Sequence, residues 1–206
     1  MLTLYHSADA RSLRCLWLLE ELNIPYELKV VKFPARILEP SFLEINPLGT
    51  VPYLIDGDTR MNESCAILTY LSSRYGDDAF QLPVEHPRYG DYLNWLHFGE
   101  AALTYTQAVS LRYRFFLPKD QRLPEVATHF QAMVYERLPL VHDAVAKSLY
   151  LCGDEFTIAD ISVGYGLFLT SMFKLDEPFS NDTKAYCERL FQRPAFLKAR
   201  EIQSVR

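Results

Sequence analysis

The segment EINPLGTVPYLIDGDTRMNESCAILTYL, residues 44–71, places a turn, a short strand, a tight reversal and a helix start within 28 residues. The apolar run VPYLID (51–56) predicts a strand, although Pro52 stands at its head, where a strand interior needs a backbone N–H. Gly57–Asp58 predicts a hairpin-type turn. An acid and a hydroxyl, Glu63–Ser64, stand where the next helix should begin. The proline and this polar pair raise the question of what the segment holds.

The residues before this segment predict a β-α-β unit. LTLYH (2–6) and YELKVV (26–31) are short apolar runs typical of strands, and the apolar residues between them recur at helical spacing. We expect Asp9 to cap that helix and Asn23 with Pro25 to end it. A crossover of this kind normally makes the two strands parallel neighbours. With the segment that follows, residues 1–76 form a complete small α/β domain.

The character of the chain changes after residue 76. DDAFQLPVEHP (77–87) is polar, has no periodicity and predicts a linker, whereas residues 88–206 show only helical patterns. Pro139 predicts a kink in one of these helices. Thr157 and Asp160 stand at the capping-box spacing before the most apolar helix. We therefore predict an all-α domain over residues 88–206.

Composition excludes several functional classes. The chain has 206 residues, 49% of them hydrophobic and 23% charged, and a net charge of −5, which does not fit a nucleic-acid-binding protein. No apolar stretch approaches the ~20 residues needed to cross a bilayer, and the first residues do not resemble a signal peptide, so we expect a cytoplasmic protein without membrane contact. The four cysteines form no C-x-x-C pair, which argues against a disulfide framework, a zinc site or a thioredoxin-type redox motif.

Four stretches carry a family resemblance: RSLRCLWLLEELNIPYEL, NPLGTVPYLID, NES and GDEFTIADISV. In this order and spacing they resemble the cytosolic glutathione transferase family, of bacterial type, over essentially the whole chain. The resemblance implies a thioredoxin-like N-terminal domain, a helical C-terminal domain that contributes the electrophile pocket, and a homodimer. It implies glutathione as co-substrate and no metal.

The resemblance also assigns roles to the residues of the opening segment. It implies a cis bond before Pro52, which turns the N–H and C=O of Val51 toward the cysteinyl backbone of glutathione. Thr50 precedes this pair and has little reach toward the glycine end, which Arg36 or Lys32 would meet instead. A helix N-terminus favours an anion, so Ser64 is expected to hold the γ-glutamyl carboxylate and Glu63 its ammonium group.

The thiol of glutathione needs an activator, because its pKa is ordinarily near ~8.5 and the thiolate is the nucleophile. The candidates lie in YHSADARS (5–12). Ser7 is preferred, at the place where serine-type classes carry their hydroxyl. Tyr5 is the alternative, since other classes use a tyrosine at the end of the strand. Arg11 and Ser12 are expected to add positive field.

The expected function is a glutathione transferase that directs the thiolate at a small electrophile. Thr104 and Tyr105 are the candidate residues for contact with that second substrate. Two alternatives remain open: a non-catalytic protein on the same fold, and a glutathione-dependent disulfide reductase, peroxidase or isomerase. The electrophile itself is not identified by the sequence.

Overall fold

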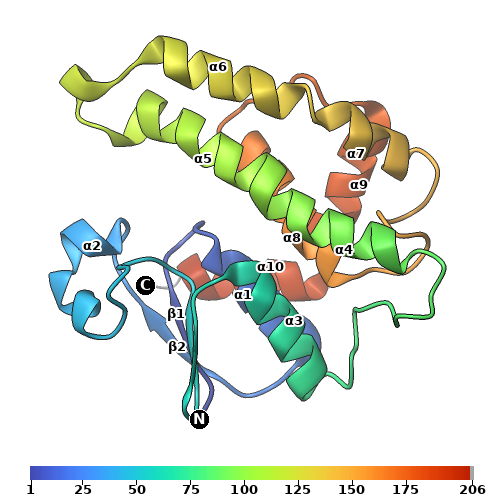
Figure 1. The fold of residues 1–206 in the computed structure, drawn as a ribbon, viewed down its shortest axis with the longest axis horizontal. Coiled ribbons are helices and arrows are strands. Elements are labelled where there is room, and N and C mark those ends of the chain that lie inside the picture. Colours follow the sequence, from blue (N-terminus) through green and yellow to red (C-terminus); the bar gives the residue numbers. More distant parts are fainter. Residues whose placement is uncertain (205–206) are drawn as a thin grey trace. The chain divides into compact units, whose positions relative to one another are not determined.

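The computed structural model describes residues 1–204 and divides the chain into two compact units (Figure 1). Unit 1 comprises residues 1–81 together with the segment from residue 191 onward, and unit 2 comprises residues 82–190. The last helix therefore packs with the N-terminal unit, although its sequence pattern placed it with the helical region. The domain boundaries expected near residues 76 and 88 stay a prediction.

Unit 1 is built on a four-stranded mixed sheet with the strand order β2-β1-β3-β4. Strands β1 and β2 are parallel, whereas β3 is antiparallel to both β1 and β4. This confirms the predicted β-α-β unit, the hairpin and the thioredoxin-like fold. The elements are β1 (Thr3–His6), α1 (Ser12–Leu22), β2 (Glu27–Val30), α2 (Ala35–Leu38), the 3-10 helix η1 (Pro40–Glu44), β3 (Tyr53–Asp56), β4 (Thr59–Met61), α3 (Ser64–Tyr75) and α10 (Pro194–Ser204).

The two faces of this sheet are covered by different helices. Side chains alternate along β1, so Tyr5 packs with α2 and η1 on one face, in a cluster that includes Ala35 and Phe42. Leu4 and its partner Leu54 are fully buried on the other face, where α1 and α3 lie (Figure 1). The loops after β1, before β3 and after β4, which carry the site residues expected in this unit, are thus held by a sheet packed on both sides.

The start of α1 corrects one expectation. Asp9 does not cap this helix: the N-cap residue is Arg11, without a side-chain cap bond, and Asp9 lies in the preceding loop with a φ of +57°. Its carboxylate instead accepts from Arg200 and Gln203 of α10. The end of α1 is as predicted, because Asn23 adopts the left-handed conformation that closes a helix.

Unit 2 is all helical, as predicted. Its first long helix is interrupted by one π-helical turn, over residues 99–104, and ends in a second, over residues 112–116. Pro139 does not kink a helix; one helix ends and a second begins, with Pro139 in its first turn, where no intrahelical N–H bond is lost. The elements are α4 (Tyr89–Phe98), η2 (Gly99–Thr104), α5 (Tyr105–Leu111), η3 (Arg112–Phe116), η4 (Lys119–Gln121), α6 (Pro124–Tyr135), α7 (Leu138–Val145), α8 (Ile158–Met172) and α9 (Asn181–Phe191).

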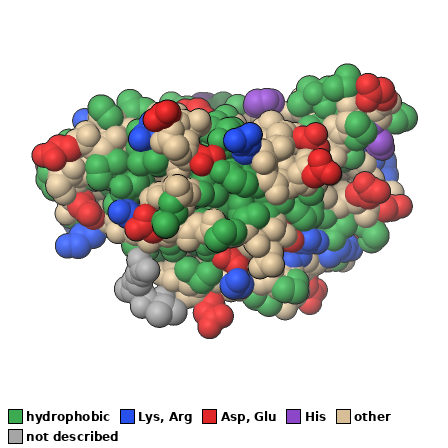
Figure 2. All heavy atoms as spheres, turned by 90° about the horizontal axis from the view of Figure 1, so that it is seen from below, with side chains coloured by type: hydrophobic (Ala, Val, Ile, Leu, Met, Phe, Trp, Pro, Cys, Tyr) green, Lys and Arg blue, Asp and Glu red, His purple; other side chains and the backbone are tan. Residues whose placement is uncertain are grey.

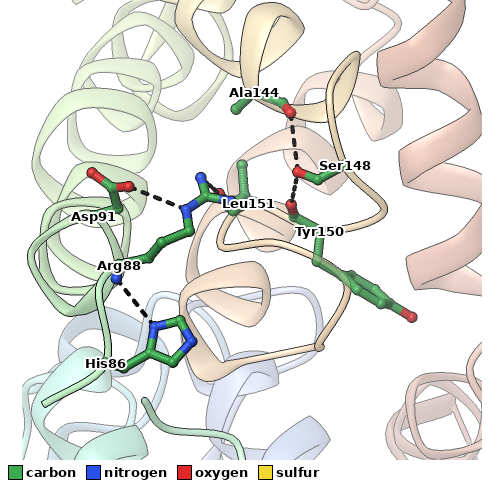
Figure 3. Close-up of polar contacts among 7 residues, drawn as sticks. All are labelled: His86, Arg88, Asp91, Ala144, Ser148, Tyr150 and Leu151. Carbon is green, nitrogen blue, oxygen red and sulfur yellow. Dashed lines mark hydrogen bonds and ion pairs between the residues drawn. The ribbon is translucent and has the colours of Figure 1, made fainter. Parts of the chain in front are cut away.

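Buried α8 is fixed at its start by the predicted capping box, which the structure confirms. Both oxygens of Asp160 are engaged: one accepts from the N–H and hydroxyl of Thr157, the other from Leu151 N–H and the Tyr186 hydroxyl, at 2.8–3.0 Å. Arg88 holds the same loop by donating to the carbonyl of Leu151 (Figure 3). Among the described residues, no helix combines the length and apolar character of a membrane span.

Candidate glutathione site

The turn before β3 presents the backbone of Val51. The Val51–Pro52 bond is cis, as predicted. Asn46 closes the turn from inside: its Nδ2 donates to the carbonyl of Thr50 at 2.9 Å, and its Oδ1 accepts from the N–H of Leu48 at 3.2 Å. Pro52 is buried, Val51 is half-buried and the Thr50 side chain is exposed. The expected backbone site is therefore formed by a hydrogen-bonded turn rather than by a loose loop.

The start of α3 brings together the other two residues expected to hold glutathione. Glu63 is the N-cap residue and is exposed, and Ser64 is the first helical residue and is buried. The Ser64 hydroxyl accepts a hydrogen bond of 3.0 Å from Nη1 of Arg14, a fully buried residue of α1. A helix N-terminus, a hydroxyl and a buried guanidinium thus converge, which is a strongly anion-favouring arrangement.

Arg14 is the residue that the sequence reasoning missed. It lies in a run, Ser12 to Leu19, in which every residue is buried. A charged side chain is almost never fully buried unless it is paired. An arginine within the apolar face of a predicted core helix was therefore an available signal for a buried anion-binding or hydrogen-bonding partner.

The residues expected to activate the thiol lie around the loop between β1 and α1. The Ser7 side chain is 1% exposed, and its hydroxyl donates to the carbonyl of Val31 at 2.8 Å. Because a hydroxyl has one proton to donate, Ser7 reaches a thiolate only by exchanging this acceptor. Ser12 is also buried, and its Oγ lies 3.2 Å from the N–H of Ser7, which donates to it. Arg11 is half-buried at the N-cap of α1.

Tyr5, the alternative activator, belongs to the aromatic cluster on the sheet. Its ring centroid lies 5.3 Å from that of Phe42 and 6.2 Å from that of Tyr53, and the residue is 8% exposed. This packing gives Tyr5 a core role in the fold of unit 1.

The residues considered for the glycine end of glutathione are both exposed, and one already has a structural task. Nη2 of Arg36 donates to the carbonyls of Pro47 and Leu48, at 3.3 and 3.0 Å, and so supports the turn before β3. Lys32 has an exposed side chain, while its backbone N–H donates to Glu39.

The structure separates the two candidates for the second substrate. Thr104 is fully buried, and its hydroxyl donates to the carbonyl of Gly99 at 2.7 Å within the π-helical turn η2. Tyr105 follows that turn and is 62% exposed. Only Tyr105 therefore offers its polar group to a ligand without breaking a bond inside the helix.

All four cysteines are buried, and none of them forms a disulfide bond. Burial raises the pKa of Cys15 and raises the pKa values of Cys152 and Cys187 to about 12. In the described part of the chain, no cluster of His, Cys, Asp and Glu is suited to a metal ion.

Comparison with known proteins adds to this geometry. The family model "Glutathione S-transferase, N-terminal domain" matches residues 10–74. Glutathione S-transferase F13 of Arabidopsis thaliana is 32% identical over 199 residues, which cover 92% of this chain and 88% of that protein. The chain belongs to the glutathione S-transferase family. It is an enzyme of the glutathione-dependent transferase type, with glutathione as co-substrate.

Three further matches cover most or all of the chain. Glutathione S-transferase 3 of Schizosaccharomyces pombe is 26% identical over 205 residues, covering 95% of this chain and 85% of that protein. The crystal structure of a glutathione transferase from Methylococcus capsulatus superposes with a TM-score of 0.87 at 25% identity, with complete coverage of both chains. A sphingomonad glutathione S-transferase complexed with glutathione has a TM-score of 0.85 at 23% identity, with 99% and 100% of the chains covered. These likenesses span both units of the chain.

Proposed function

We propose that this glutathione S-transferase holds glutathione on unit 1 and directs its thiolate at a small electrophile. The observation that carries the proposal is the start of α3, where Glu63, Ser64 and buried Arg14 meet. A γ-glutamyl group carries one carboxylate and one ammonium. The helix start and Ser64 suit the carboxylate, and the exposed carboxylate of Glu63 suits the ammonium.

The cysteinyl part of glutathione is assigned to the backbone of Val51. Pairing with this N–H and C=O adds the peptide to the sheet like a short extra strand. Thr50 borders the glycine end, and Pro52 fixes the turn of the backbone. A sphingomonad glutathione S-transferase of the same fold has a structure complexed with glutathione, which supports binding of the peptide by this fold.

The thiolate is assigned to the loop between β1 and α1. Ser7 remains the first candidate for stabilising the thiolate. Its hydroxyl would then donate to the sulfur in place of the Val31 carbonyl. The start of α1, with Arg11 and Ser12, is the second, because helix-start N–H groups and the helix dipole stabilise an anion. Both act by stabilising S⁻ relative to SH, and so lower the pKa of the bound thiol.

The electrophile is assigned to the helical unit through Tyr105, whose exposed phenol can donate to a polar group on the substrate. Thr104 supports it from inside η2. The net charge of −5 and the scattered Lys and Arg side chains on the face drawn in Figure 2 agree with a small-molecule substrate rather than a nucleic acid.

We further propose a cytoplasmic homodimer, for which sedimentation velocity tests the oligomeric state.

Calorimetric titration with glutathione tests the proposal. Glu63→Ala and Ser64→Ala should each weaken binding strongly without unfolding the protein, whereas Glu44→Ala, an exposed change in η1, should bind like the wild type. Unchanged affinity in both site variants would contradict the assignment. A panel of aryl halides, epoxides, peroxides and disulfides then separates transferase from peroxidase or reductase, and binding without turnover would favour the non-catalytic alternative.

A further inference from the structure

Helix α10 lies antiparallel along α1 and is held at one end by α1 and at the other by the loop that precedes α1. Toward the end of α1, the Arg193 guanidinium donates to both carboxylate oxygens of Glu21, at 2.6 and 2.8 Å. Lys198 forms an ion pair of 2.6 Å with Glu20. Between these contacts, the ring of Phe196 meets that of Trp17 at a centroid distance of 4.8 Å. These contacts anchor α10 to the body of unit 1.

At its other end, α10 is bonded to the loop that precedes α1. Gln203 is 5% exposed, and its amide makes two bonds to one residue: Oε1 accepts from the N–H of Asp9 at 3.2 Å, and Nε2 donates to Oδ1 of Asp9 at 2.7 Å. Arg200 forms an ion pair with the same Oδ1. Asp9 is held in the left-handed conformation that a non-glycine residue rarely adopts. The backbone of the loop is thus clamped at its middle.

The same amide also meets the end of β1. Nε2 of buried His6 lies 3.2 Å from Oε1 of Gln203. Because the N–H of Asp9 already fixes Oε1 as an acceptor, His6 must donate from Nε2, and burial keeps the ring neutral by lowering its pKa to about 4. His6 and Asp9, which flank Ser7 and Ala8, are therefore held by one side chain from α10.

We propose that Gln203, supported by Arg200, is a positioning residue that sets the conformation of the loop from Ser7 to Arg11 and thereby the acidity of the thiol of bound glutathione. The inference rests on the proposed function, in which this loop stabilises the thiolate. It does not depend on whether Ser7 or the start of α1 makes the contact.

Two physical effects act in the same direction. Hydrogen bonds weaken steeply when their angle departs from linear, so a loop that drifts loses donors to the sulfur. A carboxylate close to the loop disfavours a second anion there, and Arg200 offsets the charge of Asp9. Removing the contacts of Gln203 and Arg200 with the loop should therefore favour the SH form of glutathione over S⁻. It removes no group that binds the peptide.

The experiment titrates the ultraviolet absorbance of glutathione thiolate on the full-length protein against pH. Gln203→Leu keeps the volume and removes all three contacts of the amide, and Arg200→Met removes the ion pair on a partly exposed side chain. Each should raise the pKa of the bound thiol, by about one unit for Gln203→Leu, and lower conjugation at neutral pH by ~10-fold, with little change in glutathione affinity. Arg200→Lys, which keeps the charge, should titrate like the wild type.

Lys198→Met is the matched control, because it breaks an α1–α10 ion pair away from the loop. It should lower the unfolding temperature and leave the thiol pKa unchanged. The proposal is overturned if Gln203→Leu and Arg200→Met only lose stability and titrate like the wild type. Should Gln203→Leu fail to fold, Arg200→Met alone decides. If the wild type itself binds no glutathione or gives no thiolate signal, the proposed function fails first, and this inference fails with it.

Discussion

The guanidinium of Arg14 and the hydroxyl of Ser64 lie 3.0 Å apart and are both buried, although 50 residues separate them in the sequence. This bond joins α1 to the start of α3. It fixes the direction of the Ser64 hydroxyl, because an oxygen that accepts from Arg14 turns its own proton elsewhere. The proton is then available to a carboxylate at the helix start.

We predict that Arg14 contributes to glutathione binding through Ser64. Arg14→Met should weaken binding by about 10- to 100-fold, which corresponds to the ~1.5–3 kcal/mol of a hydrogen bond involving a charged group. A lysine lacks the planar fork, so Arg14→Lys should restore only part of the affinity. Calorimetric titration with glutathione measures all the affinities.

A double-mutant cycle tests the route of this effect. If Arg14 acts through Ser64, adding Arg14→Met to Ser64→Ala should cost much less than it costs alone. Fully additive losses would show that Arg14 supports binding by another path, and an unchanged affinity in Arg14→Met would remove it from the site.

Ser7→Ala is predicted to have two separable effects. Loss of the bond to Val31 leaves a buried carbonyl unpaired and should lower the unfolding free energy by about 1–3 kcal/mol. If the hydroxyl also serves the sulfur, the bound thiol pKa should rise by roughly one to two units and conjugation near neutral pH should fall by ~10–100-fold.

Thiolate absorbance, titrated in Ser7→Ala and Tyr5→Phe, decides between the candidates. A stability loss with a wild-type thiol titration would make Ser7 purely structural. A change in the thiol pKa confined to Tyr5→Phe would assign stabilisation of the thiolate to the tyrosine. If the thiol pKa changes in neither variant, the start of α1 remains as the group that stabilises the thiolate.

Much of this fold could be predicted from local sequence signals. The strands, the hairpin at Gly57–Asp58 and the capping box at Thr157 depend on neighbouring residues, so their patterns were sufficient. Asp9 shows the limit of such signals. Its position suits an N-cap, but contacts with α10, about 190 residues away in the chain, hold it in another role. A capping residue stabilises a helix by only ~0.5–2 kcal/mol. The ion pair of Asp9 with Arg200 and its two hydrogen bonds with the side-chain amide of Gln203 together outweigh this.

The candidate site divides in the same way. The cis bond before Pro52 was expected from the family resemblance, and the helix start at Ser64 was expected from the local sequence. The partners of side chains were not, because the acceptor of Ser7 lies on Val31, just after β2, and the donor to Ser64 lies on α1. Such contacts exist only once the sheet and helices are assembled, and no local pattern encodes them.

The close approach of η2 to α8 predicts a sharp contrast between two glycines. A Cβ on Gly99 would lie 2.4 Å from Oγ of Ser162 and 2.5 Å from its carbonyl carbon, so Gly99→Ala should destabilise the fold by about 1–3 kcal/mol. Gly90 lies on an open part of α4 with no atom within 4 Å of such a Cβ, so Gly90→Ala should stabilise it by up to ~1 kcal/mol. Chemical denaturation measures both, and equal effects would argue against close packing at Gly99.

The last prediction concerns acid stability. Burial lowers the pKa of His6 from 6.5 to about 4, so between these values the unfolded chain binds a proton that the folded chain does not. Stability contributed by the neutral ring is therefore present above pH 6.5 and is lost as the pH falls toward 4. The loss should reach about 3 kcal/mol, since each pKa unit corresponds to 1.36 kcal/mol.

His6→Gln should be less stable at neutral pH but should flatten the dependence of the unfolding free energy on pH in this range. Burial also lowers the pKa of His142, which contributes with the same sign in both proteins, so the difference between their profiles isolates His6. Unfolding free energies from denaturant titrations between pH 4 and 7 give the comparison, and parallel profiles would mean that His6 is protonated as readily in the fold as in the unfolded chain.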